Sequence, residues 1–341
     1  MTDPSAPSAP AAPTIGALLE RRALRDSEAP ALMSDGVQLN YRELHNWAVA
    51  VDAALSDAGI GSGDRVAVLS RNSAASIALY FGVARRGAIL CNANIRLEGT
   101  ELAPIIEDCA PALIIAPPEF AETAADLAKR FGIAQRWTIG EGSFPESPRG
   151  RVNELGSDLV AAAGLMNGQA PVSSDQPLLL VYTSGTTGRP RGAVLSHAGL
   201  YWAAASMVAS HDYRPTDVCL IPVPMFHVGG MSSATFFPLL GACAIVPPAW
   251  EAGVILRTIE TERVNHFFAV ATMLRSLIEH PDFGARDLSS LRFIMAGGAP
   301  VPIELIKAYS ERGIPVLHTY GSTETAGPAT VVDPKHQLTK G

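Results

Sequence analysis

The sequence predicts an α/β fold in which two doubly wound, mostly parallel sheets and their flanking helices pack as a layered sandwich. Two observations support this prediction. Short β-rich segments alternate with segments of helical apolar spacing along almost the whole chain, at the lengths of strands and crossover helices. The chain of 341 residues, with 48% hydrophobic and 17% charged side chains, can also bury a core large enough for two or three subdomains.

The alternation begins after a short leader. Residues 1–14 contain four prolines but neither the basic nor the apolar region of a signal peptide, and we expect them to form a disordered leader. Residues 65–70 favour a strand, residues 72–87 have the apolar spacing of a helix, and residues 88–93 favour a second strand. This βαβ pattern is continued by a helix at 99–109, a strand at 112–117 and a helix at 122–132.

A segment without periodicity follows the first alternation. Residues 140–157 are rich in glycine, proline and serine, which is typical of a loop, and we place a boundary within residues 140–175. The sequence therefore predicts a first α/β subdomain at residues 15–150 and a second at residues 151–341.

The second half of the chain resumes the same pattern. Ser196 is expected to cap a helix, because a serine hydroxyl can accept a hydrogen bond from a backbone amide of the first helical turn. The expected strands are residues 178–182, 218–223, 243–247, 265–270, 291–297 and 315–321. The expected helices are residues 197–209, 230–240, 253–264, 273–280 and 302–313.

Four unusual stretches each follow one of these strands, at residues 183–192, 224–230, 297–300 and 320–324. Ligands of open α/β sheets bind outside the carboxyl ends of the strands, so we expect the four stretches to meet at one edge. Each stretch alone has a simpler interpretation as a turn, a core residue or a solvated loop. Their expected convergence is therefore the strongest residue-level evidence for a ligand site.

The first stretch has the composition of an anion-binding loop. Residues 183–188 combine hydroxyl side chains with glycines, and backbone N–H groups freed by glycine can form a cradle for phosphate oxygens together with such hydroxyls. A Walker A loop that starts at Gly185 would need glycine at position 190, where Pro190 stands. The chain also lacks a GxGxxG fingerprint and a GxSxG nucleophile elbow. The sequence thus disfavours P-loop ATPases, dinucleotide-binding proteins and serine hydrolases.

Composition limits the partners of the protein. A formal charge of −7 gives no general attraction to nucleic acid or to an anionic membrane, and no apolar run is long enough to span a bilayer. The four cysteines are widely spaced without a CxxC pair, which favours buried, reduced thiols in the cytoplasm over a disulfide framework or a zinc site. We therefore expect small-molecule partners and leave a homodimer open.

The motifs, in this order and spacing, resemble the adenylate-forming superfamily of acyl- and aryl-CoA synthetases, carrier-protein adenylation domains and firefly-type luciferases. The resemblance covers nearly all of residues 15–332, and the CoA-ligase branch fits best. It implies the fold of the superfamily's N-terminal domain. The stretches that carry it are "YTSGTTGRPRGAVLSH" (182–197), "PMFHVGG" (224–230), "GGAP" (297–300) and "YGSTE" (320–324), together with residues 40–102.

The resemblance implies a reaction in two steps. A carboxylate, of a fatty or aryl acid, attacks the α-phosphorus of ATP to give acyl-AMP and pyrophosphate, and the thiol of coenzyme A then displaces AMP. ATP, Mg²⁺ and coenzyme A are the implied cofactors and co-substrates. A carboxylate is already ionised near neutral pH, so the first step needs no general base and depends on positioning and charge stabilisation.

The resemblance also implies roles for individual residues. Thr183, His227 and Glu324 are the expected catalytic residues; Glu324 would hold Mg²⁺, and His227 would stand between the acyl pocket and the entrance for the thiol. Tyr320 would stack on adenine, and Thr323 would contact the α-phosphate. The nucleotide is expected to contact Thr183, Ser184, Gly185, Thr186, Thr187, Gly188, Arg191, Gly297, Gly298, Ala299, Pro300, Tyr320, Gly321, Ser322 and Thr323. The acyl pocket is expected to include Phe226, Val228, Gly229, Gly230, Met231 and Ala271.

The chain departs from the superfamily pattern in two respects. Arg191 stands where the phosphate loop usually has lysine, which keeps the charge but changes the donor geometry. The chain stops at Gly341, before the superfamily's small β-rich subdomain and C-terminal lid domain, so we expect an N-terminal part that is impaired for complete turnover. Two alternatives stay open: an adenylation domain that loads a carrier protein, and a nucleotide- or acyl-binding module without turnover.

Overall fold

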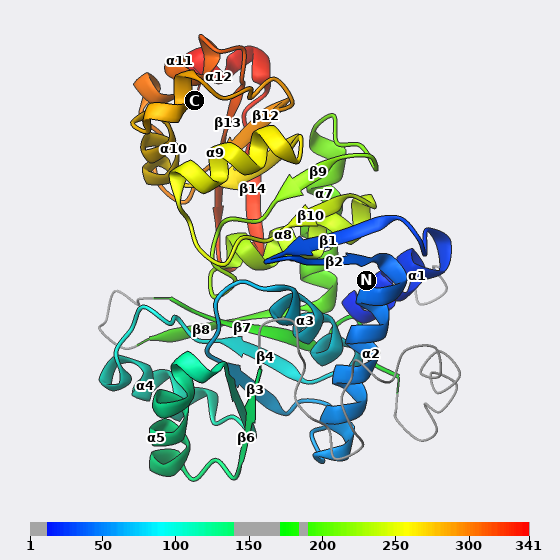
Figure 1. The fold of residues 1–341 in the computed structure, drawn as a ribbon. Coiled ribbons are helices and arrows are strands. Elements are labelled where there is room, and N and C mark those ends of the chain that lie inside the picture. Colours follow the sequence, from blue (N-terminus) through cyan, green and yellow to red (C-terminus); the bar gives the residue numbers. More distant parts are fainter. Residues whose placement is uncertain (1–11, 140–170, 184–189, 341) are drawn as a thin grey trace, which may run out of the picture.

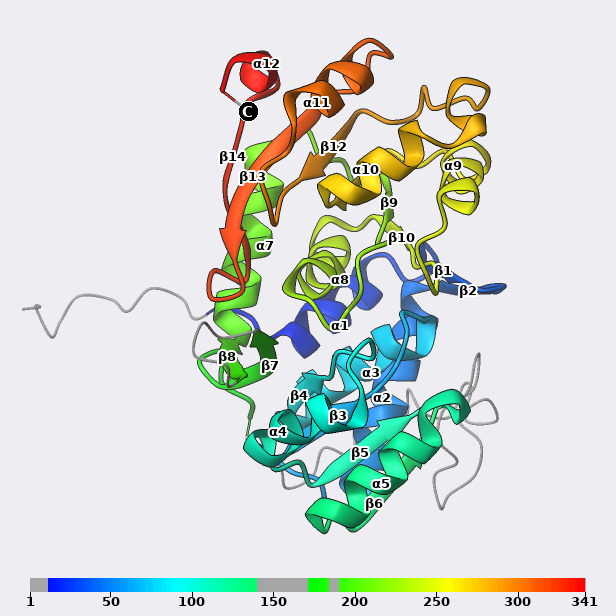
Figure 2. The ribbon, with the colours of Figure 1, turned by 90° about the vertical axis from the view of Figure 1, so that its left-hand side faces the viewer.

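The structure, a computed structural model, describes residues 12–139, 171–183 and 190–340 (Figure 1). These residues form two sheets that lie in different halves of the molecule. Helices α1 (Ile15–Arg25), α3 (Ala74–Arg86) and α8 (Val228–Leu240) lie between the sheets, as the perpendicular view shows most clearly (Figure 2). The predicted fold class, two doubly wound and mostly parallel sheets with flanking helices, is confirmed.

The first sheet has six strands in the order β6-β5-β3-β4-β7-β8. All neighbours are parallel except β7 and β8, which form an antiparallel pair. The strands are β3 (Arg65–Val68), β4 (Ile89–Asn92), β5 (Leu113–Ala116), β6 (Gln135–Thr138), β7 (Pro177–Thr183) and β8 (Arg191–Ser196). Besides α3, the helices of this half are α2 (Tyr41–Asp57), α4 (Gly99–Cys109) and α5 (Ala121–Phe131), with a 3₁₀ turn at Pro118–Phe120.

The second sheet has eight strands in the order β14-β13-β12-β11-β9-β10-β1-β2, with antiparallel pairs only at its two edges. The strands are β1 (Pro30–Ser34), β2 (Val37–Asn40), β9 (Val218–Leu220), β10 (Cys243–Ile245), β11 (His266–Ala269), β12 (Phe293–Ala296), β13 (Val316–Ser322) and β14 (Gly327–Val331). The helices that follow its strands include α9 (Ala252–Thr261), α10 (Ala271–Ile278), α11 (Ile303–Ser310) and α12 (Gln337–Lys340), with 3₁₀ turns at Pro281–Gly284 and Pro334–His336, whereas α7 (His197–Ser210) follows β8 of the six-stranded sheet.

The distribution of strands between the sheets differs from the expected division of the chain at residue 150. Strands β1 and β2 from the N-terminal part belong to the eight-stranded sheet, whereas β7 and β8 belong to the six-stranded sheet, where β7 pairs with β4. The division into subdomains at residues 15–150 and 151–341 stays a prediction. Residues 1–11 of the expected leader and the expected loop at 140–157 lie outside the described residues.

Local signals in the sequence account for several helix ends. Ser196 caps α7 as predicted, because its Oγ accepts a hydrogen bond from the N–H of Gly199 at 3.1 Å. Ser73 and Ser76 form a reciprocal capping box at the start of α3. Within α3, an ideal Cβ at Gly82 would come 2.3 Å from Val51 of α2, so only glycine permits the observed approach of these two helices.

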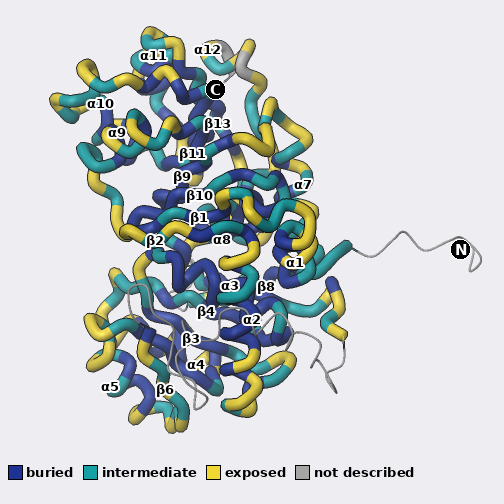
Figure 3. The backbone as a smooth tube through the Cα atoms, turned by 45° about the vertical axis from the view of Figure 1, so that its right-hand side comes forward, coloured by how far each residue is buried: buried dark blue, intermediate teal, exposed yellow. Residues whose placement is uncertain are grey.

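The largest apolar core fills the space between the two sheets, and smaller cores lie beneath the outer helices of each sheet (Figure 3). All four cysteines lie in the described part of the chain, and all are free; three are buried and Cys243 is half-buried. In the same part of the chain, no helix combines the length and the apolar character that crossing a bilayer requires.

Candidate functional site

A cavity of about 390 Å³ opens at the carboxyl ends of the eight-stranded sheet. Its wall combines the segments after β9 and β12, the end of β11, strand β13, the start of α8 and the turn between β13 and β14. The residues that line it are Met207, Val223, His227, Val228, Gly229, Ser232, Ser233, Phe268, Val270, Gly298, Thr319, Gly321, Ser322, Thr323, Gly327 and Pro328. Three of the four predicted motifs therefore contribute to one cavity.

His227 stands at the N-terminus of α8, on the cavity wall. The ring of Phe226 packs against its imidazole, with 4.6 Å between centroids, and the Arg96 guanidinium lies 5.9 Å from the centre of the Phe226 ring. Although His227 is exposed, partial desolvation by its surroundings and the charge of Arg96 lower the pKa of the imidazole from its ordinary value. The imidazole is therefore neutral at pH 7.

The hairpin of β13 and β14 presents the last motif at the rim of the cavity. Tyr320 is 72% exposed, and its ring has no aromatic partner among the described residues. Glu324 is also exposed, and hydrogen bonds from its own backbone N–H and from the Ser322 hydroxyl hold the pKa of its carboxyl below the usual range. The hairpin turn is fixed against α8 by Ser232, whose Oγ lies 2.5 Å from the carbonyl oxygen of Ala326.

The ends of β12 and β13 approach each other very closely. An ideal Cβ at Gly297 would lie 2.3 Å from Oγ1 of Thr319, which is itself buried and donates to the carbonyl of Ala296 at 3.2 Å. Gly298 follows with a φ of +81°, a conformation that favours glycine. The next residues, Ala299 and Pro300, are exposed at the rim. The predicted Gly297–Pro300 stretch thus forms a tight turn beside the cavity.

The prediction that all four motifs meet at one edge of one sheet is wrong for the first of them. Thr183 ends β7 and Arg191 opens β8, and both strands belong to the six-stranded sheet because β7 pairs with β4 there. Thr183 and Arg191 face each other as partners in the antiparallel pair. The predicted phosphate-loop residues between them, Ser184, Gly185, Thr186, Thr187 and Gly188, lie outside the described residues.

The predicted acyl-pocket residues occupy different environments. Val228 and Gly229 line the cavity. Met231, by contrast, is 1% exposed within the main apolar core, and Phe226 is 6% exposed. The residues missing from the cavity wall are Phe226, Gly230, Met231 and Ala271.

The sequence reasoning did not identify two serines in the cavity wall, Ser232 and Ser233. They follow Val228 and Gly229 by four positions on the same helix, so they share a helical face with residues that were predicted. That spacing is the signal that could have found them. The apolar wall residues Val223, Phe268 and Val270 carry no comparable local signal.

A second, much smaller cavity of about 20 Å³ lies behind the first one. The two share Met207, Ser233 and Phe268 as wall residues. The rings of Tyr213, Phe236 and His266 line the smaller cavity. Because these aromatic rings pack edge to face with centroids 4.6–5.8 Å apart, they form a rigid floor beneath the main cavity.

Comparisons with known proteins agree with this architecture. The sequence pattern of the family described as AMP-binding enzyme matches residues 19–341. Feruloyl-CoA synthase of Amycolatopsis sp is 34% identical over 327 residues, which cover 96% of this chain and 62% of that protein. Long-chain-fatty-acid–CoA ligase FadD13 of Mycobacterium tuberculosis is 31% identical over 333 residues, which cover 96% of this chain and 63% of that protein. The chain thus spans less than two thirds of the length of these relatives.

A solved structure has the same fold. The inhibitor-bound N-terminal domain of FACL13 from Mycobacterium tuberculosis matches with a TM-score of 0.84 and 30% sequence identity. The match covers 96% of this chain and 80% of that one, so both sheets fall within it.

Proposed function

Because the chain belongs to the AMP-binding enzyme family, we propose that it holds the nucleotide and acid sites for ATP-dependent activation of a carboxylic acid to acyl-AMP and then to acyl-CoA. The observation that supports this proposal most directly is the shared cavity. His227, Gly298 and Thr323 come from three separate sequence motifs and line the same 390 Å³ space, whose size is typical of small-molecule sites.

The nucleotide is proposed to lie along β13. The exposed ring of Tyr320 offers a flat surface on which adenine can stack. The turn of Gly298, Ala299 and Pro300 would border the base and ribose, and the hydroxyls of Ser322 and Thr323 would face the α-phosphate. The residues proposed for the remaining phosphates are Thr183, Ser184, Gly185, Thr186, Thr187, Gly188 and Arg191.

Glu324 is the proposed ligand for Mg²⁺. Its carboxyl is exposed and ionised at pH 7, because the hydrogen bonds described above keep its pKa low. A single carboxylate fits Mg²⁺ when nucleotide phosphates and water supply the other oxygens, which is the usual arrangement in ATP sites. Bound there, Mg²⁺ would neutralise part of the charge on the phosphates.

The acid is proposed to occupy the main cavity. Val223, Val228, Phe268 and Val270 give the cavity an apolar wall, which favours an aliphatic or aryl acid over an amino acid. Its carboxylate would face the N-terminus of α8, where the helix dipole stabilises negative charge. The neutral imidazole of His227 would separate this carboxylate from the entrance for the thiol. The floor of Tyr213, Phe236 and His266 would limit the length of the acid.

The test combines binding and turnover. An acyl-sulfamoyl-adenosine analogue should raise the melting temperature of the chain, and pyrophosphate exchange against a panel of fatty and aryl acids should reveal the preferred acid. Acceleration of AMP release by coenzyme A would identify a CoA ligase, whereas acceleration only by a carrier protein would identify a carrier loader. Binding without exchange would favour a binding module. Absence of both binding and exchange would contradict the proposed site.

Two further expectations accompany this function. A cytoplasmic location agrees with the four free cysteines, and a homodimer stays a prediction from the sequence. Cell fractionation and size-exclusion chromatography with light scattering would check them.

A further inference from the structure

The loop between β9 and α8 is held by side chains of the opposite sheet. This loop, residues 221–227, carries Val223 and His227 into the cavity wall. It belongs to the eight-stranded sheet, yet two asparagines at the carboxyl ends of β3 and β4, in the six-stranded sheet, bind its backbone. None of the four sequence motifs contains either asparagine.

Asn72 makes the larger set of contacts. It is 5% exposed and lies between β3 and α3. Its Nδ2 donates to the carbonyl oxygen of Val223 at 2.9 Å and lies 3.3 Å from that of Ile221, while its Oδ1 accepts from the N–H of Met225 at 2.8 Å. Every polar atom of the Asn72 side chain is therefore committed to this loop.

Asn92, the last residue of β4, holds the other side of the same peptide segment. Its Nδ2 donates to the carbonyl oxygen of Met225 at 3.1 Å and lies 3.2 Å from the sulfur of Met231. The N–H of Met225 is thus bound by Asn72, and the C=O of Met225 is bound by Asn92. We call these two residues the asparagine clamp.

The clamped segment cannot move without moving the start of α8. The N–H of His227 donates to the carbonyl oxygen of Pro224 at 3.0 Å, one residue before Met225. An ideal Cβ at Gly230 would lie 2.5 Å from the same Pro224 oxygen, so loop and helix pack without spare room. The N–H groups of Gly230 and Met231 both point back to the carbonyl of His227, at 3.1 and 3.3 Å. A displacement of the Met225 backbone would therefore also displace His227.

We propose that Asn72 and Asn92 are positioning residues that fix His227 and Val223 relative to the acid, by clamping the backbone of Met225. The inference rests on the proposed function of the cavity. Its physical basis is that a rigid backbone holds a reacting group within the narrow geometric tolerance that catalysis needs, where a displacement of about 1 Å can cost roughly 100-fold in rate. Because the clamp spans the two sheets, it also couples the site to their relative position.

The test uses Asn72→Ala and Asn92→Ala with Asn265→Ala as the matched control. Asn265 bridges segments in the same way, accepting from the N–H of Val218 at 2.8 Å and lying 3.3 Å from the carbonyl of Ser290, but it does so at the amino end of β9. The clamp variants should lower the rate of the thioester step roughly 10- to 100-fold while leaving the KM for ATP unchanged. Asn265→Ala should leave both constants close to wild type.

A double-mutant cycle separates positioning from general loss of stability. In a His227→Ala background, Asn72→Ala should have a clearly smaller effect on the thioester step than in the wild type, because one of the two residues that it positions is already gone. An undiminished loss in that background would overturn the proposal, and so would an equal loss in Asn265→Ala.

One readout is independent of the proposed function. The NMR titration of the His227 imidazole should shift in Asn72→Ala and Asn92→Ala but not in Asn265→Ala. An unchanged His227 titration in both clamp variants would overturn the clamp even if the wild-type chain binds acyl-adenylates. A shifted titration in a chain that binds no adenylate would instead sustain the clamp and count against the proposed function alone.

Discussion

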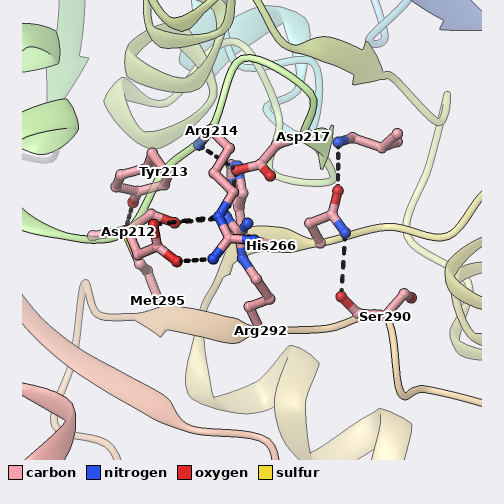
Figure 4. Close-up of polar contacts among 10 residues, drawn as sticks. Asp212, Tyr213, Arg214, Asp217, His266, Ser290, Arg292 and Met295 are labelled. Atoms are coloured by element: carbon pink, nitrogen blue, oxygen red, sulfur yellow. Dashed lines mark hydrogen bonds and ion pairs between the residues drawn. The ribbon is translucent and has the colours of Figure 1, made fainter.

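Strands β9, β11 and β12 of the eight-stranded sheet have very different surroundings at their two ends. At the amino ends, the buried Asp217 and His266 and the half-buried Arg292 form a polar cluster around an ion pair (Figure 4). At the carboxyl ends lies the cavity, with His227 on its wall and Tyr320 at its rim. The charges of the first region already have partners inside the protein, whereas His227 and Tyr320 of the second region are exposed.

The carboxylate of Asp217 is the centre of the amino-end cluster. Asp217 is 2% exposed, and its Oδ2 accepts from the guanidinium of Arg292 at 2.6 Å and from the N–H of Arg214 at 3.0 Å. The imidazole of His266 lies 3.5 Å from the same oxygen and stacks on Phe293 with 5.4 Å between ring centres. The difference between the two ends teaches that the same strands carry an internally paired cluster at one end and the proposed ligand site at the other.

The largest expected effect is the response of the amino end to acid. Burial, and then the charge of Arg292, lower the pKa of His266 from 6.5 to about 3, while Asp217 is already neutralised by Arg292. As the pH falls below 6.5, His266 therefore takes up a proton in the unfolded chain but not in the folded chain. This difference lowers the free energy of unfolding by ~1.4 kcal/mol per pH unit between pH 6.5 and about pH 3. Urea unfolding of His266→Gln between pH 6 and 4 should show a slope reduced by about one proton. An unchanged slope would mean that His266 is protonated in the fold.

The next effect concerns the ion pair in the same cluster. Asp217→Asn leaves the guanidinium of Arg292 without its buried partner, and such a loss typically costs about 3–5 kcal/mol. Urea unfolding at pH 7 should show this decrease, while binding of an acyl-adenylate analogue to the folded protein stays unchanged. The exposed pair of Arg263 and Asp287 is the matched control, since Asp287→Asn should hardly alter stability. Equal effects of the two substitutions on stability would contradict the stabilising role assigned to the amino-end cluster.

Local sequence signals predicted most elements but not their distribution between sheets. The strand at 178–182 was recognised, but its pairing with β4 depends on contacts far apart in the sequence. The segment that forms β8 was not predicted as a strand, because Arg191 was interpreted as part of the phosphate loop and Ser196 as a helix cap. Strands β1, β2, β6 and β14 were not predicted, because short or edge strands carry weak periodicity. Helices α1 and α2 were not predicted either, although α2 is 17 residues long.

The site was predicted where its residues stand together in a motif and missed where they do not. His227 and Thr323 belong to recognisable stretches. Asn72 and Asn92 have no special neighbours in the sequence, and their importance comes from the loop that the fold places against them. The same holds for Asp217, His266 and Arg292, which only the register of three parallel strands brings together.

A pair of glycines tests how tightly the carboxyl end is packed. In Gly230→Ala, the new Cβ would meet the backbone oxygen of Pro224 at 2.5 Å, which cannot move aside without disturbing the asparagine clamp. We expect a stability loss of about 1–3 kcal/mol together with loss of activity. In Gly229→Ala, the nearest atom is on the ring of Phe268 at 3.1 Å, so a smaller loss and a changed preference for acid size are expected. Thermal unfolding and the acid panel would measure both, and a milder effect in Gly230→Ala than in Gly229→Ala would contradict the geometry.

Substitution of Tyr320 is expected to weaken nucleotide binding without changing the stability of the fold. Its ring is 72% exposed, so Tyr320→Ala should leave the unfolding curve unchanged. Loss of stacking on adenine should weaken nucleotide binding by ~1–3 kcal/mol, which is roughly 5- to 150-fold. Tyr320→Phe keeps the flat ring and should bind nearly as well as wild type. Calorimetric titration with AMP would measure all three proteins, and undiminished binding by Tyr320→Ala would exclude the stacking role.

The smallest expected effect is that of Glu324→Gln, which should weaken binding of Mg-ATP but not binding of metal-free AMP. Glu324→Gln keeps the size of the side chain but removes the charge that is proposed to hold Mg²⁺, and because Glu324 is exposed the substitution should not alter stability. The affinity for Mg-ATP should fall several-fold, while the affinity for AMP without metal should stay at the wild-type value, since the carboxylate acts only through the cation. Glu311→Gln, at the exposed end of α11, serves as the control for a lost surface charge and should change neither affinity. Titrations at several Mg²⁺ concentrations would distinguish a weakened metal site, which excess Mg²⁺ restores, from a direct contact to the nucleotide, which it does not. Equal losses for Mg-ATP and AMP would place Glu324 with Tyr320 among the groups that recognise the nucleotide itself.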